Sequence, residues 1–205
     1  FYTNQWTRKA AMYDLYGMIP GLGRNMAGLL PFGNGEPEPY ESHTMVMSLL
    51  GARNNDPVAQ WIALNSSYDR LGSLQPLWVD YSRSQADVPS LPNWRFFNDR
   101  GLFVFRSSWA NDAMYFALKC GPHWGGHEHP DAGAFVLYKD GFPYVAPSHY
   151  LKGHGLEDEN IVLVNGKGLD GRSASDAYAK AIPPEKYASM RQVVAPNRNV
   201  SPTRD

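Results

Sequence analysis

The sequence is short of cysteine and of long apolar runs. Cys120 is the single cysteine among 205 residues, which excludes a framework of internal disulfides. No apolar run approaches the roughly 18 residues that a membrane-spanning helix needs, and no signal peptide is visible. Because the chain starts at Phe1 without a methionine, we expect it to be a fragment of a longer protein.

The sequence also lacks an excess of charge of either sign. Lys and Arg number 19 and Asp and Glu 20, for a net charge of -1. There is therefore no basic field for nucleic acid and no acidic tail, and we expect neither nucleic-acid nor membrane partners. The composition does not indicate an oligomeric state. Aromatic residues are abundant, with 12 Tyr and 6 Trp; they are core material, and their flat rings are also platforms for sugars.

Helical spacing dominates the first part of the chain. Residues 3–17 place apolar and aromatic side chains at helical intervals, which predicts an amphipathic helix. A second helix is predicted over residues 42–51. Asp56 and Pro57 form a cap and first-turn pair, and the apolar stripe over residues 58–64 predicts a third helix behind them.

Strand-like alternation replaces the helical spacing after about residue 100. Residues 101–108 and 113–119 are predicted to form two antiparallel strands. Residues 135–145 are predicted to form a hairpin, because Asp140–Gly141 separates two extended runs and Asp-Gly is a strong hairpin signal. A further strand is predicted over residues 160–164.

Helices thus precede strands, and residues 71–95, which show no periodicity, separate the two parts. This order indicates an α+β fold with two layers or two domains. We predict a helical portion at residues 1–80 and an antiparallel β portion at residues 95–205 that is itself incomplete.

The chemistry is concentrated in one glycine-rich segment that leads into the hairpin. His123, His127 and His129 fall within seven residues, and Asp131 follows. Residues two apart on an extended strand point to the same face, so His127 and His129 are placed to share one site. A surface turn is the simplest explanation for one such histidine, but three with an aspartate favour a functional site. Imidazoles in this pattern serve either metal ligation or proton transfer near neutral pH.

The residues around this segment resemble a known family. Phe105-Arg-Ser-Ser-Trp109 and then Gly125-Gly-His-Glu-His-Pro-Asp131, running into Ala134-Phe-Val-Leu-Tyr-Lys-Asp-Gly141, resemble the heparinase II/III-like polysaccharide lyases. The related dermatan-sulfate epimerase domain is similar through the same His-Glu-His-Pro-Asp. The resemblance implies the C-terminal part of an incomplete (α/α) toroid followed by an antiparallel β-sandwich, with the active site in the cleft between them.

The resemblance also implies a reaction and residues to perform it. The family cleaves acidic polysaccharides by β-elimination at a uronic acid, which requires a base for the C5 proton and an acid for the leaving O4. On this basis His127, Tyr150 and Tyr2 are the predicted catalytic residues. Arg106 is predicted to pair with an acidic sugar and Trp124 to bind the sugar ring; a strand residue facing solvent or a structural salt bridge is the alternative for Arg106.

No redox cofactor is expected, but the resemblance implies a structural divalent metal. His129 matches the family's metal ligand, and Glu159 stands where the family has a later histidine. One His with one Glu is a poor zinc site, since closed zinc sites take about four ligands, mostly nitrogen or sulfur. His149, Asp158 or Asn160 could supply the missing metal ligands. Such a ligand set would be rich in oxygen, which suits manganese or calcium.

The leading hypothesis is therefore a polysaccharide lyase, periplasmic or secreted by resemblance to its family. A uronate C5-epimerase is the first alternative, because it removes the same proton and returns it to the other face. A catalytically degenerate carbohydrate-binding domain is the second, since an acid expected near Val145 is absent. A metal-dependent hydrolase is the least favoured. The mild charge balance favours an unsulfated polyuronate such as alginate over a sulfated glycosaminoglycan.

Overall fold

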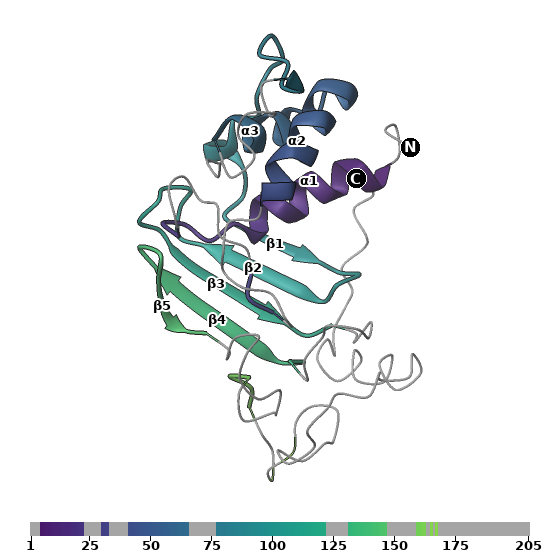
Figure 1. Cartoon of the computed structure of the whole chain (residues 1–205). Coiled ribbons are helices and arrows are strands. Elements are labelled where there is room, and N and C mark those ends of the chain that lie inside the picture. The colour runs from purple at the N-terminus through teal and green to yellow at the C-terminus, as the bar shows by residue number, and fades with distance from the viewer. Residues whose placement is uncertain are drawn as a thin grey trace.

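The computed structural model describes residues 5–22, 30–32, 41–65, 77–121, 131–146 and 159–162, together with Asn165 and Lys167. Helices come first and an antiparallel sheet follows, and α1 is the helix nearest the sheet (Figure 1). The elements are α1 (Gln5–Gly17), α2 (Glu41–Asn54), α3 (Pro57–Asn65), the 3-10 turn η2 (Val88–Ser90), β1 (Trp94–Phe97), β2 (Leu102–Arg106), β3 (Met114–Lys119), β4 (Ala134–Lys139) and β5 (Phe142–Val145).

The three predicted helices are confirmed, and the local signal is clearest at α3. The Asp56 carboxylate accepts hydrogen bonds from the backbone N–H groups of Val58 (2.9 Å) and Ala59 (3.1 Å). Pro57 occupies the first helical position, where a missing N–H has no cost. None of the helices in the described ranges combines the length and the apolarity needed to cross a membrane.

The sheet has the strand order β1-β2-β3-β4-β5, and each neighbouring pair is antiparallel. The predicted pairing of residues 101–108 with 113–119 and the predicted hairpin are both confirmed. At the hairpin turn Lys139 pairs with Phe142, which leaves two residues in the loop. Asp140 (φ 53°) and Gly141 (φ 72°) both adopt positive φ, as a type I′ turn requires.

Two expectations about strands differ from the structure. β1 begins at the end of the stretch that shows no periodicity, and no local pattern predicted it as a strand. It is a short strand at the edge of the sheet. Its sequence has one arginine among three aromatic residues, which is too short a polar–apolar alternation to predict a strand. In the opposite sense, residues 160–162 of the predicted strand 160–164 form a turn and irregular backbone. A short apolar run does not by itself distinguish a strand from other buried backbone.

One face of the sheet packs against the helices. The register places Val104, Ala117 and Val136 in one row across β2, β3 and β4, and all three are fully buried. Tyr16 of α1 meets Trp109 edge-to-face, with ring centroids 5.2 Å apart. A single buried cluster contains side chains of all three helices and of β2, β3 and β4. The two predicted portions therefore share a core, while their division into separate domains stays a prediction.

The other face of the sheet carries aromatic side chains that are only half-covered. Trp94, Phe96 and Phe105 are 57%, 39% and 38% exposed, and the register sets Trp94 opposite Phe105. A second sheet is not present among the residues that the structure describes. Helices with a five-stranded antiparallel sheet are thus established, and the β-sandwich and the toroid stay predictions.

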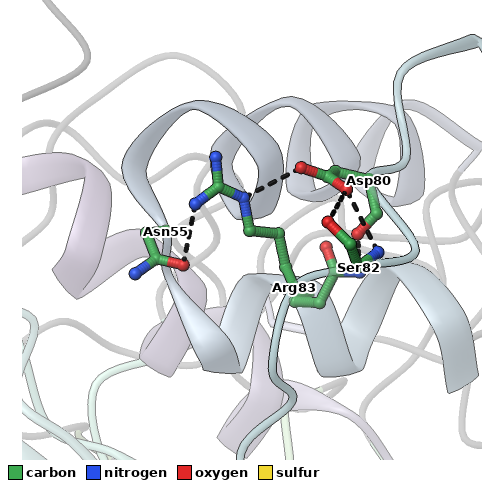
Figure 2. A network of polar contacts seen from close by, with 5 residues as sticks. Asn55, Asp80, Ser82 and Arg83 are labelled. Atoms are coloured by element: carbon green, nitrogen blue, oxygen red, sulfur yellow. Dashed lines mark hydrogen bonds and ion pairs between the residues drawn. The ribbon is translucent and has the colours of Figure 1, made fainter.

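A polar network fixes the connection between helices and sheet (Figure 2). The Asp80 carboxylate accepts hydrogen bonds from the Ser82 hydroxyl (2.6 Å) and from Arg83 Nε (2.9 Å). Arg83 also donates to the Asn55 side chain, at the corner between α2 and α3 (3.4 Å). The two hydrogen bonds from Ser82, with the one from Arg83 and its positive charge, lower the pKa of Asp80 below its usual value. The buried Gln60 amide donates to the Asp80 carbonyl (2.9 Å), so this connector is held on α3.

Two buried tyrosines of the inner face give a matched test of core hydrogen bonding. Tyr115 donates its hydroxyl hydrogen to the Tyr16 carbonyl (2.8 Å), whereas the Tyr138 hydroxyl has no hydrogen-bond partner within the described ranges. We expect Tyr115→Phe to lower the free energy of unfolding by about 1 kcal/mol, and Tyr138→Phe to leave it unchanged or raise it by up to about 1 kcal/mol. Chemical denaturation measures both, and equal destabilisation by the two substitutions would contradict this assignment.

Candidate active site

Most of the predicted site residues lie outside the part of the chain that the structure describes. Those outside are Tyr2, Trp124, His127, His129 and Tyr150. Their predicted roles in catalysis, sugar binding and metal binding stay predictions. Arg106 and Glu159 are described, as is the support on which the histidine segment is mounted.

The segment that carries the histidines, residues 120–130 (the histidine segment), lies in the connection between β3 and β4, two neighbouring inner strands of the sheet. β3 ends at Lys119 and β4 begins at Ala134, and the register pairs these two residues directly. The Gly133 N–H donates to the Lys119 carbonyl (2.7 Å), and the Ala134 N–H donates to the Asp131 carbonyl (2.9 Å). The chain therefore leaves and re-enters the sheet at one point, held by backbone hydrogen bonds.

A buried ion pair lies at this same point. The Lys119 ammonium is 2.8 Å from Oδ1 and 2.9 Å from Oδ2 of Asp131, and it donates a hydrogen bond to Oδ2. The Lys119 side chain is 12% exposed and that of Asp131 is fully buried. Asp131, which the sequence pattern grouped with the histidines, is thus directed to the sheet's own lysine. No feature of the local sequence singles out Lys119 as its partner.

Arg106 lies at the end of β2 with its side chain fully buried. Its Nη2 donates toward three carbonyls at the C-terminal end of α1, those of Leu15 (3.4 Å), Tyr16 (3.2 Å) and Met18 (3.0 Å). The last carbonyls of a helix have no partner within the helix and carry partial negative charge. A guanidinium is therefore a suitable partner for them, and it joins α1 to the sheet.

Aromatic rings complete the surroundings of the guanidinium. Its central carbon lies 4.0 Å from the ring centroid of Trp109, 5.3 Å from that of Tyr115 and 5.9 Å from that of Tyr16. Nε and Nη1 have no hydrogen-bond partner in the described residues, so cation–π attraction to these rings offsets part of the lost hydration. Burial lowers the pKa of Arg106, although arginine keeps its charge at neutral pH.

This arrangement does not present Arg106 to a polysaccharide. The expected contact with an acidic sugar requires an accessible guanidinium, and here the side chain is buried under α1. The two alternatives for Arg106, a strand residue that faces solvent and a structural salt bridge, are also wrong. Its side chain is buried, and its partners are backbone carbonyls and aromatic rings. The alternation along β2 carried the relevant signal, since Leu102 and Val104 share the face of Arg106 and are buried.

Glu159, the predicted partner of His129 at a metal, is fully buried. A buried carboxylate is a group that divalent cations bind. However, the described residues contain no group of three or more His, Cys, Asp or Glu side chains that could hold an ion. These residues alone do not form a metal site, and the metal stays a prediction that depends on His129.

Comparison with known proteins confirms the resemblance found in the sequence. Residues 89–161 match the family model described as Heparinase II/III-like, C-terminal. A heparin-sulfate lyase from Bacteroides stercoris is 32% identical over 108 residues, which cover 45% of this chain and 16% of that protein. The chain thus spans about a sixth of the length of this curated relative.

Two solved structures show a partial similarity of shape. A heparinase III gene product has 19% identity and a TM-score of 0.46, covering 69% of this chain and 19% of that chain. The heparan sulfate lyase HepC from Pedobacter heparinus has 18% identity and a TM-score of 0.44, covering 62% and 17%.

Proposed function

We propose that this chain is part of a polysaccharide lyase that cleaves a uronic-acid-containing glycosaminoglycan by β-elimination. The observation that carries the proposal is the match of residues 89–161 to the heparinase II/III-like C-terminal family. The matched residues include the whole His-Glu-His-Pro-Asp motif. The position of the histidine segment between β3 and β4, two neighbouring inner strands with one buried face, supports the proposal, because catalytic groups need a rigid support.

The proposed reaction removes the proton from C5 of the uronate. The electrons of the C5–H bond form a C4–C5 double bond, the C4–O4 bond breaks, and O4 takes a proton as it leaves. The carboxylate must be neutralised for C5–H to be acidic enough, and the enolate-like state must be stabilised. We assign these tasks to His127, with Tyr150 and Tyr2 as the groups that transfer the protons.

The same proposal extends to the substrate, to the rest of the fold and to the cellular location. The matched relative is named a heparin-sulfate lyase, so heparan sulfate is the first substrate to test, ahead of the unsulfated polyuronates that the charge balance favours. A toroid and a β-sandwich would place the cleft between the helical layer and the sheet. Periplasmic or secreted location follows from the family resemblance.

The direct test is to mix the full-length protein separately with heparan sulfate, chondroitin sulfate, dermatan sulfate, hyaluronan and alginate. Elimination creates an unsaturated uronate, whose ultraviolet absorbance should rise with at least one substrate. Deuterium uptake from solvent at C5 without cleavage would instead identify an epimerase. Binding to an acidic glycan without exchange would identify a binding domain, and either result would overturn the lyase assignment.

A further inference from the structure

The ion pair between Lys119 and Asp131 has features that distinguish it from a surface contact. Its carboxylate is fully buried and its ammonium is 12% exposed. By contrast, Lys139 and Asp140 on the β4–β5 hairpin are 3.9 Å apart and about half-exposed, at 49% and 60%. Exposed pairs contribute little to stability, whereas removing one partner of a buried pair leaves an uncompensated charge.

The buried pair joins the two residues that bracket the histidine segment, Lys119 before it and Asp131 after it. The turn between β1 and β2 also restrains the backbone where the chain leaves β3. The Cys120 N–H donates to the Gly101 carbonyl (2.7 Å), and a Cβ on Gly121 would collide with the backbone of Arg100. Only glycine allows this approach, so the chain direction at Gly121 is strongly restricted.

We propose that Lys119 and Asp131 are positioning residues that set the geometry from which His127 acts; this inference rests on the proposed function. Neither residue is assigned a contact with substrate. The backbone hydrogen bonds determine where the segment starts and ends, and the ion pair restrains its two ends relative to each other. Small displacements of a catalytic group reduce turnover strongly, so loss of the pair should lower kcat more than it raises KM.

The first test measures the restraint without reference to activity. In the full-length protein, Lys119→Met should accelerate hydrogen exchange of the Cys120, Gly133 and Ala134 amides, which are hydrogen-bonded beside the pair, by about tenfold or more, because the buried carboxylate loses the Lys119 ammonium. Lys119→Arg keeps the charge and should retain the wild-type rates at these amides. Lys139→Met, which removes the exposed pair, is the matched control and should leave these rates unchanged. Equal rates in wild type and Lys119→Met would overturn the proposal.

The second test separates positioning from stability. We expect the double variant Lys119→Met/Asp131→Leu to regain the unfolding midpoint of wild type, since apolar pairs of similar volume replace buried ion pairs well. Its kcat should nevertheless remain about tenfold or more below wild type, with KM within about twofold, because an apolar contact lacks the directed hydrogen bond. Recovery of kcat together with stability would show a structural role only and would overturn the inference.

The two tests also separate this inference from the proposed function. If the wild-type protein cleaves none of the glycans, the lyase assignment fails, while the exchange experiment still decides whether the pair restrains the segment. If the wild-type protein is active and Lys119→Met exchanges and turns over like wild type, the positioning role fails and the lyase assignment stands.

Discussion

Arg106→Met is expected to lower the free energy of unfolding by about 2–4 kcal/mol. Methionine retains an apolar stem that can pack among Trp109 and Tyr115, but it cannot donate to the carbonyls at the end of α1. Those carbonyls would then be buried without their cationic partner. Urea denaturation followed by tryptophan fluorescence measures the change.

Arg95→Met is the matched control for this prediction. The Arg95 guanidinium also lies over the Tyr16 ring, at 5.6 Å from the centroid, but the side chain is only half-buried. Its removal should therefore cost about 0.5–1 kcal/mol. An intermediate loss is expected for Arg106→Lys, because an ammonium cannot reproduce the planar guanidinium among the rings. A loss for Arg106→Met no larger than for Arg95→Met would contradict the assigned role.

His127→Ala is expected to abolish turnover, with a loss of about 10²–10⁴-fold or more in kcat/KM. The imidazole is assigned to neutralise the uronate carboxylate and to stabilise the enolate-like state, and no other residue of the motif is assigned to these tasks. Stability should change by less than about 0.5 kcal/mol, as for substitutions away from core contacts. Glycan cleavage measured by ultraviolet absorbance, together with thermal unfolding, checks both parts.

His123→Ala is the matched control within the same segment, because no role in the reaction is assigned to His123. It should cleave the same substrate at a rate near that of wild type. If His127→Ala retained turnover, or if His123→Ala lost as much, the motif would not be working through His127. The lyase assignment would then need another group to neutralise the uronate carboxylate.

Local signals predicted most of the regular structure. The Asp56 cap depends on residues within three positions, and the Asp140–Gly141 turn depends on two positive φ angles. Signals of this kind are readable because the interacting groups are close in sequence. β1 was not predicted, because its sequence has little strand pattern of its own. It is a strand because it pairs with β2.

The candidate site divides in a similar way. The histidine motif and the family that it resembles were recognisable from residue identity and order, and the match of residues 89–161 to that family's model confirms the resemblance. The position of Arg106 was not recognisable, because an arginine in Phe105-Arg-Ser-Ser-Trp109 looks available to a sugar acid. Its true partners are carbonyls that precede it by 88 to 91 residues.

By itself the sequence determined the helices, the four strands from β2 to β5, the hairpin turn and the resemblance that names a reaction, since each follows from residues close together in the chain. Only the tertiary structure decided that a buried arginine joins α1 to the sheet and that Lys119 holds Asp131. The physical reason is that a charged group interacts with the polar groups that folding places within about 3–4 Å of it. Those groups can lie at any distance along the sequence.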